Sequence, residues 1–335
     1  MESQHMAGLT VAIGGDGEVV WSKGFGLADV ENDVPATEYT VYRMASVSKP
    51  VTAAAVMQLV EQGKIDLDGL VGTYVSAWPE KRWPITIRQL LGHQGGVRHY
   101  AEKDVVSNTK AYSTSTESLE YFADDPLIVE PGTKYSYSTY GFNLLGAVIE
   151  GASDMSFVDY LVEHVYPLAG TETMQDDSQS RLIKHRARGY SFASTESSSA
   201  NQNPGGAPPG ELRNAMLVDV SYKVGGSGLC STAADLVRFA QSMEAGKVVK
   251  PESRDLMWTA QKTREGTQTS YGMGWIIAER AGRRFVVHVG TQLGASTSLI
   301  LLRDEGIVVA VMCNTEDTNP GLIGRRIAFL VESSR

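Results

Sequence analysis

Both ends of this chain have the pattern of tightly joined β-strands, which restricts the fold more than any other feature. Near the N-terminus, strand-like runs at 9–13 and 18–22 flank the turn sequence Gly-Gly-Asp-Gly at 14–17. Near the C-terminus, strand-like runs cover 271–278, 284–289, 296–302 and 307–313. Strands joined by such short turns are antiparallel. We therefore expect an antiparallel sheet to which both ends of the chain contribute.

The middle of the chain has helical periodicity instead. A capping box at 86–89 precedes an apolar pair. Apolar periodicity predicts helices over 116–124, 141–150, 156–166 and 232–245, and a closing helix over 320–332. The stretch 191–210 is rich in Ser, Gly, Pro and Asn, which predicts an exposed loop. The predicted fold class is α/β: an antiparallel sheet flanked by helices, plus an inserted all-helical domain.

We expect two domains with the active site between them. Residues 1–64 and 215–335 would form the α/β domain, and residues 65–214 the mostly helical one. The length of 335 residues suits one large or two ordinary domains.

Composition excludes several classes of function. The hydrophobic fraction of 42% and the charged fraction of 21% are those of a soluble globular protein. The net charge of −9 argues against nucleic acid as a partner. No apolar stretch is long enough to span a membrane, and no metal or nucleotide motif predicts a cofactor. As written, the start of the chain is no signal peptide, which predicts a cytoplasmic protein, or a periplasmic or secreted one if a leader was removed.

Ser46 and Lys49 are the strongest candidates for chemistry. They lie three residues apart where a helix should begin, and residues at i and i+3 share a helix face. A serine becomes a nucleophile when a neighbouring base takes its proton. Pro50 is tolerated only in the first turn of a helix, so it fixes the helix start near Ser46. The pair therefore predicts a serine hydrolase of the Ser-Lys type.

One competing match must be weighed. Ser107 and Lys110 have the same spacing, but they lie in a polar segment without apolar periodicity. Context therefore favours Ser46.

Two further segments hold candidate partners for this serine. The stretch 131–146 contains Tyr135, Tyr137 and Tyr140, any of which could be a packing residue. In the strand-like run 284–291, His288 is followed two residues later by a glycine, which often marks close approach of another backbone.

Taken together, these segments resemble the serine β-lactamase and penicillin-binding protein family. The resemblance is closest to its class C branch, with D-alanyl-D-alanine carboxypeptidases, family VIII esterases and mitochondrial β-lactamase-like proteins. The segments that match, in the family's order, are 24–31, 42–49, 90–96, 131–146, 225–235 and 288–290.

The resemblance implies a role for each matching residue. Ser46 would be the acylated nucleophile, Lys49 its base or proton partner, and Tyr137 the tyrosine that exchanges protons with the serine. His288 and Gly290 would belong to the strand that lines the site. The backbone N–H groups of Ser46 and of Thr291 would form the oxyanion hole. Whether Lys49 or the tyrosine is the base stays open.

Two departures from the family bear on the substrate. Thr139 replaces the usual asparagine that binds an acyl-amide, and His288 replaces the usual lysine that meets a substrate carboxylate. An ester or peptide therefore fits better than a β-lactam. We predict an esterase; the alternatives are a D-alanyl-D-alanine carboxypeptidase or other peptidase with weak β-lactam binding, or a structural homologue of low activity. The expected partner is a small ester, peptide or β-lactam, and a homo-oligomer stays open.

Overall fold

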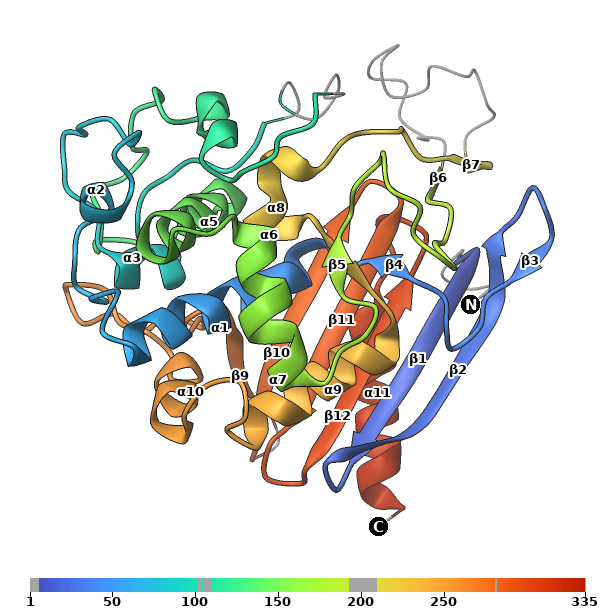
Figure 1. Ribbon diagram of the computed structural model, residues 1–335. Coiled ribbons are helices and arrows are strands. Elements are labelled where there is room, and N and C mark those ends of the chain that lie inside the picture. The colour runs from blue at the N-terminus through green and yellow to red at the C-terminus, as the bar shows by residue number, and fades with distance from the viewer. Residues whose placement is uncertain (1–5, 102–103, 105–109, 193–209, 281, 335) are drawn as a thin grey trace.

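The centre of the molecule is one antiparallel sheet built from both ends of the chain (Figure 1). The computed structural model describes residues 6–101, 104, 110–192, 210–280 and 282–334. Its seven strands lie in the order β3-β2-β1-β12-β11-β10-β9. They are β1 (Gly8–Gly15), β2 (Glu18–Asp29), β3 (Val34–Pro35), β9 (Ile276–Arg280), β10 (Arg283–Gln292), β11 (Ala295–Leu302) and β12 (Ile307–Cys313). Because β1 pairs with β12, the predicted sheet is confirmed.

Two short sheets and a set of helices complete the described elements. The short strands are β4 (Tyr42–Arg43), β5 (Gln175–Asp176), β6 (Tyr190–Phe192), β7 (Leu212–Asn214) and β8 (Leu229–Ser231). The helices are η2 (Ala45–Val47), α1 (Ser48–Glu61), α2 (Val71–Tyr74), α3 (Ile87–Leu91), η3 (Glu117–Tyr121), α5 (Thr139–Ser153), α6 (Phe157–Tyr160), η4 (Leu161–Val165), α7 (Tyr166–Ala169), η5 (Ser221–Lys223), α8 (Val224–Ser227), α9 (Ala233–Glu244), α10 (Pro251–Met257) and α11 (Pro320–Ser333). None of the described helices is long and apolar enough to cross a bilayer.

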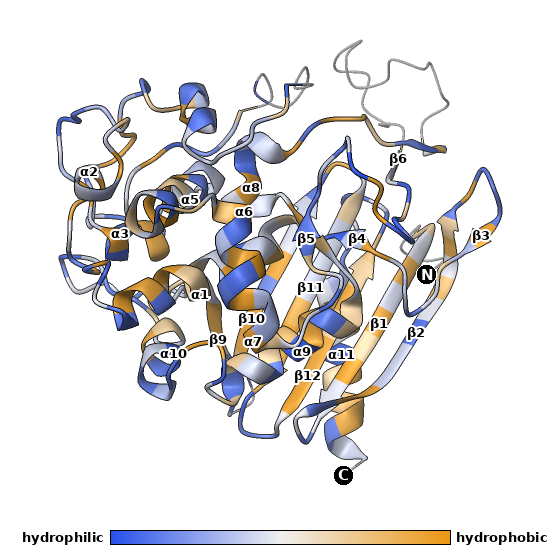
Figure 2. Ribbon diagram, in the orientation of Figure 1, coloured by the Kyte–Doolittle hydropathy of each residue, from blue (hydrophilic) through white to orange (hydrophobic). Residues whose placement is uncertain are grey.

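The sheet has an apolar layer on each face. Alternate residues of β11 and β12 belong to different cores: Leu299 and Ala310 pack towards α1 and α9, whereas Ile300 and Val309 pack towards α11. Figure 1 shows α11 behind the sheet and α9 in front of it, and Figure 2 shows the apolar colouring of β12 and β1. A strand covered on both faces has to be apolar throughout, which explains the continuous apolar run of β12.

Helix α1 is buried on nearly all sides. Its residues from Ser48 to Leu59 are all buried, and a helix that is apolar all round belongs in a core. It lies in front of the sheet and also contacts α5 and α8. The N-terminal end of α1 is therefore held rigidly where these layers meet.

Several predicted boundaries were wrong. The predicted strand over 271–278 begins only at Ile276, because Gly274 adopts φ 81° and turns the chain. The predicted helix over 116–124 is only the short 3-10 helix η3; Pro126 follows closely and disfavours a helical residue before it. Of the predicted loop 191–210, the first two residues belong to β6, and 193–209 lie outside the described residues.

Candidate active site

Ser46 lies in the 3-10 turn η2, two residues before the first residue of α1. Ala45 before it has φ 48°, a left-handed conformation that costs a residue with a side chain about 1–3 kcal/mol and that clusters at functional sites. Ser46 itself is partly exposed, while Ala45 and Val47 are fully buried. The backbone therefore presents this one hydroxyl at the surface of the core.

The Lys49 amine contacts the Ser46 hydroxyl directly. Its Nζ lies 3.1 Å from Ser46 Oγ, 3.2 Å from Thr139 Oγ1 and 2.8 Å from the carbonyl oxygen of Gly226. Lys49 is completely buried in the first turn of α1. The sequence therefore correctly placed these two side chains beside each other. The competing serine, Ser107, lies outside the described residues.

Close packing of α8 against α5 brings the carbonyl oxygen of Gly226 to the amine. A Cβ on Gly226 would lie 2.6 Å from the Thr139 carbonyl oxygen, and one on Gly225 would lie 2.7 Å from the Phe142 carbonyl oxygen. Only glycine permits such an approach of two backbones. The two glycines therefore position an acceptor for the Lys49 amine.

The environment of Lys49 favours its neutral form. Burial lowers its pKa well below the usual value, and the positive charge of Lys223 lowers it further. A neutral amine has two N–H donors and one lone pair. Donation to Thr139 and Gly226 uses both donors and leaves the lone pair for the Ser46 hydroxyl proton.

Tyr137 is the tyrosine that lies beside this pair. Lys49 Nζ lies 4.8 Å from its ring centroid, and a hydrogen bond to Ser46 acts on its phenol. Burial raises the pKa of Tyr137 and outweighs the smaller lowering by Ser46. Tyr140, by contrast, stacks on Phe122 with ring centroids 4.4 Å apart, away from the serine.

His288 is a neutral imidazole rather than a cation. Its Nδ1 lies 2.9 Å from the Val289 carbonyl oxygen, so Nδ1 carries the proton, and Nε2 accepts from the Tyr271 hydroxyl at 2.9 Å. Burial, and next the charge of Lys49, lower the pKa of His288 to about 3.

Strand β10 passes close to Ser46. A Cβ on Gly290 would lie only 2.6 Å from the backbone nitrogen of Ser46. Pairing with β9 ends at Val287, so within the described residues the edge of β10 from His288 onward has no neighbouring strand on that side. Thr291 follows on this edge and is exposed. The edge therefore borders the serine and offers backbone groups to a ligand.

Three residues that contact the site were not predicted to have a role in it. Nδ1 of His93 accepts the Ser138 N–H at 3.2 Å, and the His93 ring centroid lies 4.3 Å from that of Tyr137. Nδ1 of His99 accepts the Thr139 N–H at 3.1 Å. Tyr271 holds His288 as described above. His93 lies in the matched segment 90–96, but nothing in the local pattern indicates which ring it contacts.

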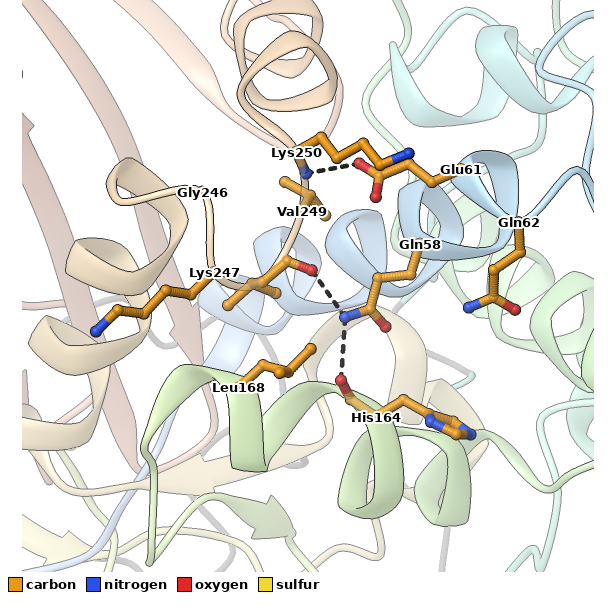
Figure 3. A pocket seen from close by; sticks show the side chains of 10 residues that line it. Gln58, Glu61, Gln62, His164, Leu168, Gly246, Lys247, Val249 and Lys250 are labelled. Carbon is orange, nitrogen blue, oxygen red and sulfur yellow. Dashed lines mark hydrogen bonds between the residues drawn. The ribbon is translucent and has the colours of Figure 1, made fainter.

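A cavity elsewhere in the described residues has a different character. It measures about 370 Å³ and lies at the C-terminal end of α1 (Figure 3). Its lining residues are Gln58, Glu61, Gln62, His164, Leu168, Gly246, Lys247, Val248, Val249 and Lys250. The Gln58 amide spans it and donates to the carbonyl oxygens of His164 and Val248. No serine, cysteine or threonine lines it, so it offers no nucleophile of the kind found at Ser46.

Comparison with known proteins agrees with this geometry. The family model described as Beta-lactamase matches residues 1–331. The chain belongs to this family. It is 30% identical to the human serine beta-lactamase-like protein LACTB, mitochondrial, over 98% of this chain and 77% of that protein. It is 26% identical to penicillin-binding protein 4* of Bacillus subtilis, over 94% of this chain and 69% of that protein.

Solved structures share the fold. The octameric penicillin-binding protein homologue from Pyrococcus abyssi matches with a TM-score of 0.82 and 26% identity, over 99% of this chain and 75% of that chain. Two further structures share the fold alone. The D-amino acid amidase from Ochrobactrum anthropi SV3 matches with a TM-score of 0.80 and 21% identity, over 94% of this chain and 89% of that chain. The hydrolase EstCE1 matches with a TM-score of 0.77 and 23% identity, over 94% of this chain and 91% of that chain. The predicted β-lactamase-like fold and family are therefore confirmed.

Proposed function

We propose that this chain is a serine hydrolase that forms an acyl-enzyme on Ser46 and hydrolyses carboxylic esters. One observation supports this most strongly: a fully buried amine, Lys49, lies 3.1 Å from the Ser46 hydroxyl. Membership of a family of serine hydrolases supports the same reaction.

Lys49 is the base for acylation in this proposal. Its lowered pKa leaves a lone pair to take the Ser46 proton as the oxygen attacks the ester carbonyl. Tyr137 keeps its proton because its pKa is raised, so it acts as a donor. It protonates the leaving alkoxide and then recovers a proton through Lys49. Deacylation reverses these transfers, with water in place of the alcohol.

The oxyanion would be bound by backbone N–H groups of Ser46 and Thr291. The close passage of β10 at Gly290 supports this assignment, because it brings the strand to the backbone of the nucleophile. Removing one such donor in other hydrolases costs about 3–4 kcal/mol of transition-state stabilisation.

Two contacts favour an ester over a β-lactam. Neutral His288 has both ring nitrogens hydrogen-bonded, so it offers no positive charge to a carboxylate at that position. The Thr139 hydroxyl accepts from Lys49 and is a short group, so it makes a poor ligand for an acyl-amide. A peptidase is the second candidate. The open edge of β10 favours it, since an extended peptide can pair with such an edge.

A labelling experiment and a substrate panel test the proposal. Intact mass spectrometry after incubation with a fluorophosphonate should show one adduct, and peptide mapping should place it on Ser46. Short-chain p-nitrophenyl esters should then be cleaved faster than D-Ala-D-Ala peptides, with nitrocefin slowest. An adduct elsewhere would overturn the site, and faster peptide cleavage would select the second candidate.

Tyr137→Phe should reduce kcat for a p-nitrophenyl ester roughly 100-fold or more, with little change in KM, because it removes one proton-transfer group. Tyr140→Phe is the matched control, since Tyr140 stacks on Phe122 and should leave kcat unchanged. Steady-state kinetics on both variants would separate a proton-transfer role from a packing role. Equal losses in both would contradict the assignment.

Gly290→Ala should reduce kcat/KM roughly 100-fold, because its Cβ would lie 2.6 Å from Ser46 N and displace the nucleophile or β10. Gly17→Ala is a control on backbone strain: Gly17 has φ 84° and open space around it, so this variant should lower the melting temperature without slowing turnover. If the loss of kcat/KM in each variant is proportional to its loss of melting temperature, the effect of Gly290→Ala is one of stability and not of a displaced Ser46 or β10.

We also retain a homo-oligomer as a proposal. The octameric Pyrococcus abyssi homologue supports it. Light scattering on the purified chain tests it, and a monomeric mass at micromolar concentration would exclude it.

A further inference from the structure

Lys223 is a buried lysine beside the site that the proposed mechanism does not use as a reactant. It ends η5 and directly precedes α8, whose Gly226 carbonyl oxygen accepts from Lys49. Only 3% of Lys223 is exposed. The positive charge of Lys223 reaches the site electrostatically, since it lowers the pKa values of both Lys49 and His99.

A row of aromatic rings leads from the nucleophile to this amine. The Tyr137 ring, next to Lys49, lies 5.5 Å from that of His99, which lies 3.9 Å from that of Tyr100. Lys223 Nζ lies over Tyr100, 4.6 Å from its ring centroid. Tyr100 and His99 are only partly buried, so this row of rings borders solvent.

The amine of Lys223 has no anionic partner among the described residues. Its recorded contacts are with the faces of Tyr100 and Tyr222, and no described side chain or carbonyl gives it an ion pair or hydrogen bond. Burial, and next the positive charge of Arg43, lower the pKa of Lys223. An unpaired buried cation is costly, and an anion placed against it offsets that cost.

We propose that Lys223 binds a carboxylate of the substrate, so that the ester cleaved at Ser46 is an anionic one. This inference rests on the proposed function and names its substrate class. Since His288 is neutral and Arg43 is paired with Asp177, Lys223 is the amine available for this role near the serine. Its charge-assisted hydrogen bond would orient the substrate along the aromatic row.

Matched ester pairs test the preference. The carboxylate is placed in the acyl part with 4-nitrophenyl hydrogen glutarate against 4-nitrophenyl valerate, and in the leaving group with 4-acetoxybenzoate against its methyl ester. For one of the pairs, kcat/KM should be roughly 10- to 100-fold higher for the anion, and the favoured pair identifies the side of the scissile bond that faces Lys223. This ratio should fall as the pH rises through about 7, where Lys223 loses its charge.

Lys223→Met should reduce the anion-to-neutral ratio of kcat/KM to about one by raising KM for the anion. Because Lys223 also lowers the pKa of Lys49, both esters share any change in the base, and the ratio between them cancels it. Lys223→Arg should retain part of the preference. Lys64→Met, at an exposed lysine beyond the C-terminal end of α1, should retain all of it. Equal rates for anionic and neutral esters in the wild type would overturn the inference, even if Lys223→Met did not fold. If neither ester acylates Ser46, the proposed function is wrong, and the inference that rests on it is wrong too. Cleavage of both esters at equal rates contradicts the inference alone.

Discussion

Ser46→Ala should reduce ester hydrolysis roughly 10⁴- to 10⁶-fold. The reason is chemical: the variant lacks the oxygen that forms the acyl-enzyme, and the surrounding N–H groups can then only bind the substrate. Folding should be preserved, because the Ser46 hydroxyl is partly exposed and its recorded partners are Lys49 and Tyr137. Hydrolysis of p-nitrophenyl acetate and labelling by a fluorophosphonate measure the loss.

Ser107→Ala is the matched control for this variant. Ser107 has the same spacing to a lysine, Lys110, and should keep full activity and labelling. Residual turnover in Ser46→Ala within tenfold of the wild type would remove Ser46 from the mechanism.

Lys49→Met should lower kcat/KM roughly 10²- to 10⁴-fold, because it removes the base and leaves a side chain of similar length. The Thr139 hydroxyl and the Gly226 carbonyl oxygen lose their donor, which adds a stability cost of about 1–3 kcal/mol for each buried group. Steady-state kinetics and thermal melting measure the two effects separately. Lys64→Met again controls for loss of a lysine, since Lys64 is exposed and lies beyond the C-terminal end of α1.

The pH dependence distinguishes a base from a fixed cation at Lys49. Since its pKa is lowered from 10.5, kcat/KM should rise with pH as the neutral amine forms and reach a plateau below pH 10.5. In the same range the unfolded chain binds more protons at Lys49 than the folded one, so the unfolding free energy should also rise with pH. The rise should be smaller in Lys49→Met. A rate that falls with pH would contradict the neutral-amine mechanism.

The sheet could be predicted because its signals are local. Asp16 and Gly17 both adopt positive φ, and this backbone suits a two-residue hairpin turn, which the Gly-rich sequence predicts. Alternating and continuous apolar runs predicted β11 and β12, with bounds close to those in the structure. The predicted strand start near Tyr271 failed because Gly274 turns the chain where it lies against α1, so closely that a Cβ on it would be 2.5 Å from the Ala53 Cβ.

The reacting pair could be predicted for the same reason, since Ser46 and Lys49 are neighbours on one turn. The residue pattern left Tyr137 as one of three tyrosines, and only the family resemblance selected it; its ring centroid lies 4.8 Å from the Lys49 amine. The neutral state of His288 depends on Tyr271, a residue on a separate segment. No local pattern connects the two.

The sequence alone determined the sheet, the helix that starts at the nucleophile, and the spacing of serine and lysine, because each depends on residues within a few positions of one another. Only the tertiary structure decided the charge of the groups around them. Burial of Lys49, its distance from Lys223 and the enclosure of His288 result from contacts between segments far apart in the chain. Ionisation responds to such surroundings, since desolvation and nearby charges act through space and not along the sequence.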